Sequence, residues 1–232
     1  MNAAERKPIP RVRASAILVA AAFSWLSFAA MTVMAVVNEG RPGRPFSDPI
    51  LAVVPYVPWI DHWNYWIWLL AWIPGLVTIF LVDRAILVRV LIASGLASLL
   101  RGVCILATGL APPNGLDPNA ALPWDWALRW RVILQILNPV SVFLENSAHV
   151  WLTKDLFYSG HTCSTFLLVL FGWPIKRMRG AFVFTHIVVV ASVIFGHVHY
   201  AIDVAGGWIA ALLVFAWVRR MPLGWIQDPP LG

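Results

Sequence analysis

Long apolar runs separated by short polar segments dominate the chain. Six of these runs reach or approach the roughly 20 mostly apolar residues that cross a bilayer as a helix. They are Ala14–Val37, Trp63–Val82, Ala85–Thr108, Leu156–Trp173, Ala181–Gly196 and Asp203–Val218. The last two are short and need polar ends or tilt to span. The pattern therefore predicts an all-α, polytopic membrane protein with six transmembrane helices.

A long connection separates the third and fourth apolar runs. Its first part, APPNGLDPNAALP, consists of turn-forming residues. Its second part, Trp126–Trp151, is apolar but is interrupted by two arginines, by the Asn138-Pro139 pair and by Glu145. We interpret this part as an interfacial or re-entrant helix between the third and fourth spans, and not as a seventh span.

Composition and charge support this class and orient the chain. Only 12% of the residues are charged, against about a quarter in soluble domains. The net charge of +6 comes from short basic clusters between apolar runs, not from a stripe that would bind nucleic acid. With the N-terminus inside, eleven of the 17 Lys and Arg residues fall on the cytoplasmic side. We predict cytoplasmic tails at residues 1–13 and 221–232 around a six-span catalytic domain at residues 14–220, compatible with a bacterial inner membrane.

This topology brings ionisable residues from four segments to one level on the non-cytoplasmic side. Ionisable side chains within membrane spans are costly, and by default they indicate a functional site. The residues that share this level are Arg101, Asp155, His161, His197, His199 and Asp203. The sequence therefore predicts a site at the non-cytoplasmic rim of the bilayer.

The spacing of these residues indicates phosphate chemistry. His199 and Asp203 are four residues apart, so on a helix they share one face. The carboxylate can then hold one ring nitrogen as a donor and leave the other as a nucleophile. The tripeptide Ser159-Gly160-His161 places a favoured N-cap and free N–H groups beside a histidine. Arg101 can grip the same anion bidentately, so we predict an anion cradle with an acid–base histidine.

Each of these signals also has a structural interpretation. The His–Asp pair can join helices, Ser-Gly-His can be an ordinary helix start, and Arg101 can extend to the interface. Zinc binding by His161, His197 and His199 is another alternative. Because no HExxH or Cys-rich spacing accompanies these histidines, we predict neither a metal nor a cofactor. The convergence of all signals at one depth favours the functional interpretation.

Two further features predict helix packing. His186 lies in the middle of the fifth span, where a polar side chain can hydrogen-bond to a neighbouring helix. The Gly206-Gly207 pair in the sixth span allows another helix to approach closely. We assign neither feature to the chemistry.

Two stretches resemble the catalytic motifs of the sphingomyelin synthase-like family, part of the PAP2-like superfamily of lipid phosphatases and phosphotransferases. Asp155–Thr162 resembles Asp-x-x-x-Ser-Gly-His-Thr, and Gly196–Val204 resembles His-x-His-Tyr-Thr-x-Asp-Val. Arg101–Pro113 and Pro45–Asp48 resemble two further motifs of that family, in the same order along the chain. The resemblance covers most of the chain between residues 44 and 218.

The chain departs from the family pattern at a few positions. Thr153-Lys154 replaces Cys-Gly, Ala201 replaces a threonine, and Ser47 replaces a proline. Lys154 adds a positive charge at the rim of the predicted site, where it is expected to alter the preference for headgroup or acceptor.

The resemblance implies that His161, His199 and Asp203 form a catalytic triad. His199, oriented by Asp203, would attack the phosphorus of a lipid headgroup and form a phosphohistidine. His161 would protonate the departing lipid oxygen and then deprotonate the acceptor hydroxyl. The residues expected to assist or to bind phosphate are Asp155, Arg101, Ser159, Gly160 and His197.

The resemblance implies a phospholipid headgroup phosphotransferase. A phosphocholine- or phosphoethanolamine-type group would move from a phospholipid donor to a lipid alcohol, ceramide or diacylglycerol. One alternative is a lipid phosphatase or phospholipase-C-like hydrolase, for which water is the acceptor. Another is a non-enzymatic membrane transporter or scaffold, but transport favours polar residues near the bilayer midplane. No nucleic acid is an expected partner, and the oligomeric state is open.

Overall fold

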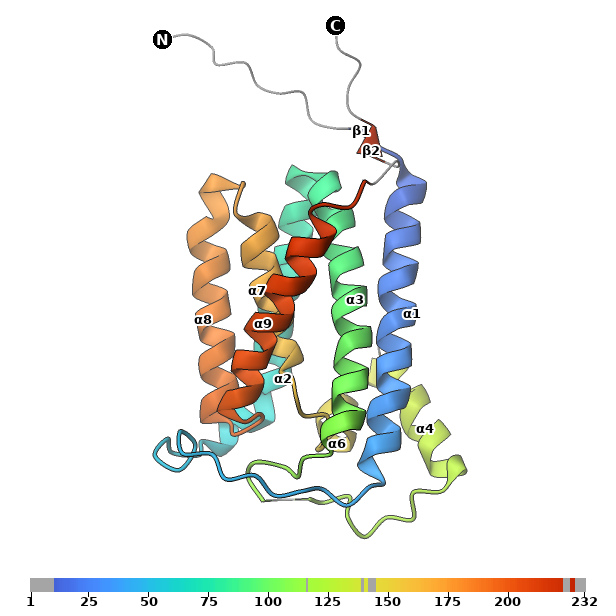
Figure 1. Ribbon diagram of the computed structural model, residues 1–232, viewed down its shortest axis with the longest axis vertical. Coiled ribbons are helices and arrows are strands. Elements are labelled where there is room, and N and C mark those ends of the chain that lie inside the picture. Colours follow the sequence, from blue (N-terminus) through green and yellow to red (C-terminus); the bar gives the residue numbers. More distant parts are fainter. Residues whose placement is uncertain (1–10, 116, 139, 142–144, 223–225, 228–232) are drawn as a thin grey trace, which may run out of the picture.

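The computed structural model describes residues 11–115, 117–138, 140–141, 145–222 and 226–227, and it places the long helices side by side in one bundle (Figure 1). A 3₁₀ turn, η1 (Lys176–Met178), leads into α8. The helices are α1 (Ala14–Glu39), α2 (Pro58–Val82), α3 (Arg84–Thr108), α4 (Trp126–Leu137), α6 (Ser147–Trp151), α7 (Gly160–Gly172), α8 (Arg179–Phe195) and α9 (Ala201–Val218).

Among the described residues, five helical segments have the length and apolar composition to cross a membrane: α1, α2, α3, η1 with α8, and α9. This finding confirms the polytopic α-helical class. The fourth predicted span corresponds to α7, which has only 13 residues. At 1.5 Å per residue it is about 20 Å long, shorter than the roughly 30 Å hydrocarbon core. We predicted that this helix starts at Leu156, but it begins at Gly160. Residues 156–159 are not helical, because Arg101 bonds to the Tyr158 carbonyl and Ser159 N bonds to the Asp203 carbonyl.

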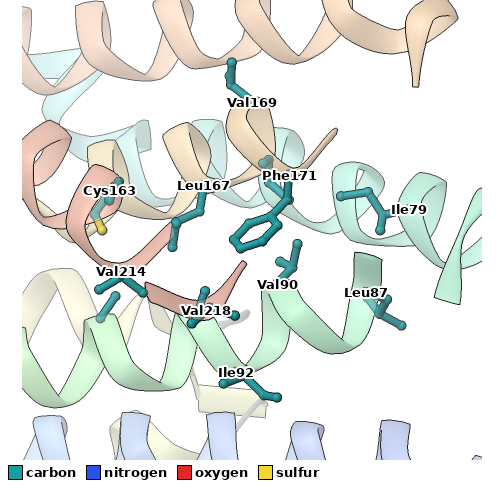
Figure 2. Close-up of a cluster of buried hydrophobic side chains, with 14 of the residues drawn as sticks. Ile79, Leu87, Val90, Ile92, Cys163, Leu167, Val169, Phe171, Val214 and Val218 are labelled. Carbon is teal, nitrogen blue, oxygen red and sulfur yellow. The ribbon is translucent and has the colours of Figure 1, made fainter. Parts of the chain in front are cut away.

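Helix α7 lies in the middle of the bundle and contacts α2, α3, α8 and α9. Figure 2 shows Leu167 and Phe171 of α7 packed among Val90 of α3 and Val214 and Val218 of α9. A helix surrounded on most sides buries nearly its whole circumference, so it needs no polar stripe. The outer helices instead expose large apolar side chains, as expected for a surface that faces lipid.

The two ends of the bundle differ. At one end, β1 (Arg11–Val12) pairs antiparallel with β2 (Ile226–Gln227), so the described part of the chain begins and ends there (Figure 1). The prediction of an all-α fold missed this ribbon, because two-residue strands leave no period-2 pattern. At the other end the long loops meet: Arg44 forms a parallel bridge with Leu110. The loops that carry the predicted site lie at this second end.

In the described part of the segment Trp126–Trp151, the helix is interrupted at Asn138 and at Asn146, so α4 and α6 are separate helices and not the single helix that we predicted. Helix α4 begins after its N-cap Asp125, whose carboxylate accepts a hydrogen bond from Leu128 N at 2.8 Å. It ends at Leu137, just before Asn138-Pro139, because a residue that precedes proline disfavours helical geometry. One face of α4 packs on α1 through Val36 and a group of buried residues, Val132, Ile133 and Ile136.

Helices α7 and α9 approach each other closely at Gly207, as predicted. A Cβ atom at Gly207 would lie 2.9 Å from the carbonyl oxygen of Ser159 and 3.1 Å from Cβ of Thr162. A backbone carbonyl cannot move away as a flexible side chain can. Glycine at this position therefore fixes the distance between the start of α7 and the start of α9, which carry the predicted site.

We expect Gly207→Ala to lower the free energy of unfolding by about 1–3 kcal/mol, the usual cost of overpacking. Gly180→Ala is the matched control, because a Cβ at Gly180 has open space around it and alanine favours the helix. Thermal unfolding in detergent should show a lower midpoint for the first variant and an equal or higher one for the second. Equal midpoints for both variants would contradict this account of the α7–α9 contact.

Candidate functional site

The turn before α9 brings His199 and Asp203 together. Nδ1 of His199 lies 3.3 Å from Oδ2 of Asp203. The same oxygen accepts a hydrogen bond from the backbone N–H of Tyr200 at 3.1 Å, which caps the helix. Both side chains are buried, and a carboxylate is favoured at a helix N-terminus by the helix dipole. Because Nδ1 faces the carboxylate, Nε2 is the ring nitrogen left to react.

The start of α7 brings His161 to the same place. Ser159 is the N-cap, as predicted, and its side chain accepts a hydrogen bond from Thr162 N. The ring centroids of His161 and His199 are 6.1 Å apart, with an interplanar angle of 62°. Two contacts of about 3 Å each span such a separation. A single phosphate group can therefore contact both imidazoles.

Arg101, on α3, holds the loop that leads into α7. Its Nε donates to the Tyr158 carbonyl at 2.9 Å, and its Nη2 donates to the Asp155 carbonyl at 2.7 Å. Nη2 also pairs with the Asp155 carboxylate at 2.8 Å. A Cβ at Gly160 would lie 3.1 Å from this guanidinium, so glycine lets the arginine reach the loop. These contacts make Arg101 a positioning residue, and direct binding of an anion by Arg101 stays a prediction.

Asp48, in the loop after α1, anchors the first residue of α9. Its Oδ2 accepts a hydrogen bond from Ala201 N at 2.6 Å, and its Oδ1 accepts one from Ile50 N at 2.8 Å. The sequence drew attention to the Pro45–Asp48 stretch without giving Asp48 a role. Contacts between a side chain and the backbone of a distant segment leave no spacing pattern, so only the folded chain reveals this one.

Tyr200, the residue after His199, contacts two of the loops around the site. Its hydroxyl donates to the Ala111 carbonyl at 2.9 Å, and its ring packs edge-on against Phe46 at 5.2 Å. Burial raises the pKa of the Tyr200 hydroxyl, so it remains a donor through the physiological pH range. The loop after α1 and the loop after α3 thus converge on the turn that holds His199.

We expect Asp48→Ala to lower the free energy of unfolding by about 1.5–3 kcal/mol, the usual value of a hydrogen bond to a charged group. Ser47→Ala, the neighbouring exposed position, should change it little. Thermal unfolding of the two variants in the same detergent compares them directly. A drop of the same size in both variants would mean that the loop as a whole, and not its carboxylate, supports α9.

Trp68, on α2, lies beside His161 and was not found from the sequence. The two ring centroids are 5.4 Å apart at 76°. The indole Nε1 donates to Ser164 Oγ at 2.8 Å, and the indole stacks on Trp72 at 5.4 Å. The sequence does not single out Trp68, because α2 is rich in tryptophan and such residues are common at membrane interfaces.

His186 joins three helices, which confirms its predicted packing role. The Trp208 indole can only donate, so its bond of 2.9 Å makes Nε2 of His186 an acceptor. Nδ1 of His186 then carries the proton and faces Thr165 Oγ1 at 2.8 Å. Thr165 in turn donates to the His161 carbonyl at 2.8 Å. The network supports the backbone of α7 where His161 is attached.

His197 contacts a different segment from His199. Its Nε2 lies 3.0 Å from the Val54 carbonyl, which can only accept, so His197 donates to the loop before α2. A part in phosphate binding by His197 stays a prediction. Among the described residues no three His, Cys, Asp or Glu side chains are grouped to hold a metal ion, so the zinc alternative gains no support.

Lys154 does not project into the site as the sequence suggested. It is only 4% exposed, and its Nζ pairs with the Asp117 carboxylate at 2.8 Å. The same Nζ donates to the carbonyls of Glu39 and Arg41 at 3.0 and 3.2 Å. The positive charge of Lys154 is therefore neutralised by Asp117, and its bonds to the carbonyls of Glu39 and Arg41 attach the segment before Asp155 to the end of α1.

Comparison with known proteins gives one match. Residues 154–221 match the family model described as PAP2 superfamily C-terminal. The matched stretch includes α7, α8 and α9 and thus His161, His199 and Asp203. No curated protein matches the chain significantly. The match supports a place in the PAP2-like superfamily, whose members are phosphoryl-transfer enzymes.

Proposed function

We propose that the protein is a membrane phospholipid headgroup phosphotransferase of the sphingomyelin synthase-like type, with His161, His199 and Asp203 as its catalytic residues. One observation carries the proposal: two imidazoles from distant segments lie 6.1 Å apart, and a buried carboxylate faces one of them. A nucleophile and an acid–base group on either side of one phosphate are what a two-step phosphoryl transfer needs.

In the first step, Nε2 of His199 attacks the phosphorus of the donor headgroup. A P–N bond forms, and the bond from phosphorus to the lipid oxygen breaks. His161 gives a proton to that oxygen, so the lipid leaves as an alcohol. Asp203 stabilises the positive charge that develops on the His199 ring, because its carboxylate faces Nδ1.

In the second step, the acceptor hydroxyl gives its proton to His161 and attacks the phosphohistidine. The new P–O bond forms as the P–N bond breaks, and His199 returns to its starting state. Trp68 packs against His161, and Arg101 holds the loop before it. Both contacts keep the imidazole in place while it first releases and then takes up a proton.

The acceptor separates transfer from hydrolysis. A lipid alcohol such as ceramide or diacylglycerol gives a new phospholipid, and water gives a free headgroup phosphate. Thr153 and Lys154 depart from the family motif, and they contact Glu39 of α1 and Asp117. These departures therefore place no new group beside the histidines. We therefore favour transfer, with hydrolysis as the alternative.

An assay with a phospholipid labelled in its headgroup tests the proposal. The purified protein is incubated with this donor, with and without ceramide or diacylglycerol. We expect a new labelled lipid that depends on the acceptor. Release of a labelled, water-soluble phosphate ester without any labelled lipid would support the hydrolase. Absence of both products for every phospholipid donor class would refute the assigned chemistry.

The orientation of the site is part of the proposal. The β1–β2 ribbon and the start of α9, which carries Asp203, lie at opposite ends of the bundle (Figure 1), and the distribution of Lys and Arg favours cytoplasmic termini. In a variant without Cys104 and Cys163, a new cysteine at the exposed Ala121 should react with an impermeant reagent in intact cells. One at the exposed Gly180, near the terminal end, should react only after permeabilisation. The reverse result would invert the topology.

A further inference from the structure

A polar cavity lies at the same end of the bundle as the proposed catalytic site. Its volume is about 540 Å³, and it is lined by the C-terminal end of α1, the loop before α4, α4 itself and the segment before Asp155. Half of its ten lining residues carry a charge: Glu39, Arg41, Asp117, Arg129 and Lys154. It shares no lining residue with His161, His199 or Asp203, so it is a separate site.

The charges around the cavity are unevenly paired. Lys154 uses its three donors on Asp117 and on two carbonyls. Both carboxylate oxygens of Glu39 accept hydrogen bonds, one from the Thr153 hydroxyl and one from the Lys154 backbone. Two acids and three bases leave one net positive charge if all are ionised, so the cavity favours an anion.

Two arginines supply the unpaired positive charge. Arg41 donates from Nη1 to the Leu106 carbonyl at 2.7 Å. Arg129 donates to the Trp124 and Val37 carbonyls at 2.8 and 3.3 Å. Within the described ranges neither guanidinium forms an ion pair with a carboxylate. Guanidinium groups are well suited to bind phosphate through two parallel hydrogen bonds.

Asp117 adds an acceptor to the same cavity. Its Oδ2 pairs with Lys154, whereas its Oδ1 is buried and has no hydrogen-bond partner in the described part of the chain. A buried carboxylate oxygen without a donor is costly, so a bound hydroxyl or ammonium group would be stabilised there. The cavity thus offers cations for a phosphate and an acceptor for a second polar group.

The position of α4 indicates the source of the ligand. Trp126, Trp130 and Leu134 repeat every four residues on one face and are 64%, 55% and 65% exposed. Exposed tryptophans of this kind mark the level of lipid headgroups. The cavity lies between α4 and the end of α1, at the level where membrane phospholipids present their phosphates.

We propose that this cavity binds the headgroup of a membrane phospholipid. The phosphate contacts Arg41 and Arg129, and the Asp117 carboxylate accepts a hydrogen bond from a hydroxyl or an ammonium group of the headgroup. The bound lipid bridges α4 and α1 and contacts Lys154. Lys154 directly precedes Asp155, which Arg101 binds. This site is independent of the proposed transfer reaction, since its ligand is bound and not consumed.

The experiment uses the full chain with His199→Ala, so that no lipid is turned over. Native mass spectrometry counts the lipids retained with dihexanoylphosphatidylglycerol and, separately, with dihexanoylphosphatidylcholine. Ala120→Glu places a carboxylate at an exposed lining position, and Ala121→Glu places the same charge at the next exposed position, outside the lining. We expect Ala120→Glu to retain one lipid fewer, with about tenfold weaker binding or more, because like charges oppose binding.

Two further measurements test whether the cavity recognises the phosphate of the lipid. Arg41→Gln, which leaves the fold-supporting contacts of Arg129 intact, should weaken the same binding event, and dihexanoylglycerol, which lacks the phosphate, should not occupy the site. Equal lipid counts and affinities in the Ala120→Glu and Ala121→Glu variants would overturn the proposal. So would retention of dihexanoylglycerol that Ala120→Glu weakens and Ala121→Glu does not, since the cavity would then bind a lipid without a phosphate. Binding of inorganic phosphate with no phospholipid retained would also overturn it. Loss of the lipid from a catalytically inactive variant does not depend on whether the transfer assay succeeds.

Discussion

Replacement of His199 with alanine is expected to lower headgroup turnover by about 10³-fold or more, because the loss of a nucleophile removes the covalent route. The phosphohistidine cannot form without this ring. Rapid quenching of the unsubstituted protein with a donor labelled at phosphorus should trap a labelled protein, with the acid-labile bond of a phosphoramidate. The alanine variant should show no such label and no burst of lipid alcohol.

The neighbouring histidine offers a matched control. His197 lies two residues before His199 but donates to the Val54 carbonyl in another loop. His197→Ala should therefore retain the label, and its predicted part in phosphate binding should appear as a higher KM with kcat largely kept. His199→Ala should lose both the label and the turnover. A purified His199→Ala protein with full turnover would refute the mechanism. A large loss in both variants, accompanied by a lower unfolding midpoint in both, would indicate a structural role for the whole turn.

The long helices could be predicted because a bilayer imposes a simple requirement on sequence. An apolar run of sufficient length has few alternatives to a spanning helix, since its backbone must satisfy its own hydrogen bonds. The predicted start of α1 at Ala14 and the ends of α2 at Val82 and α3 at Thr108 agree with the structure. The start of α7 was predicted too early, because the apolar residues Leu156 and Tyr158 are buried in a non-helical segment that packs against other parts of the chain.

The site could be predicted in part, for a related reason. His199 and Asp203 are four residues apart, with Asp203 in the first turn of α9 and His199 just before its N-cap Tyr200. Ser159 lies two residues before His161, so local geometry is enough to relate each pair. The proximity of the two pairs followed from topology alone, because the direction of each span sets which ends meet. Distances within the site depend on close packing, as at Gly207 against Ser159, and no sequence pattern gives these.

Long-range contacts of single side chains were outside the reach of the sequence. Asp48 caps α9 from 153 residues away. Lys154 is buried and pairs with Asp117, although a lysine is expected at the surface because of its charge. Trp68 lies beside His161, but as one of several tryptophans in α2 it could not be singled out. In each case the partner is a group that only the folded chain brings near.

Arg101→Lys is expected to lower kcat by about 10²-fold, the effect of an error of roughly 1 Å in the position of a catalytic group. Lysine keeps the positive charge but cannot reach both the Tyr158 carbonyl and the Asp155 carboxylate, which Nε and Nη2 contact at 2.9 and 2.8 Å. The loop before His161 then loses its anchor to α3. Asp155→Asn, which weakens the same anchor without changing Arg101, should lower kcat in the same direction by a smaller factor.

Arg89→Lys is the control for this prediction. Arg89 lies on the same helix, is half-buried, and donates to the Val218 carbonyl at 2.7 Å at the opposite end of the bundle. Its substitution should leave kcat within a few fold of the original value. The kinetic constants then separate two roles for Arg101. A positioning residue lowers kcat with little change in KM, whereas a residue that only grips the bound anion raises KM and leaves kcat unchanged. A raised KM with unchanged kcat in Arg101→Lys, together with full activity of Asp155→Asn, would show that the Arg101–Asp155 pair does not act by holding His161 in place.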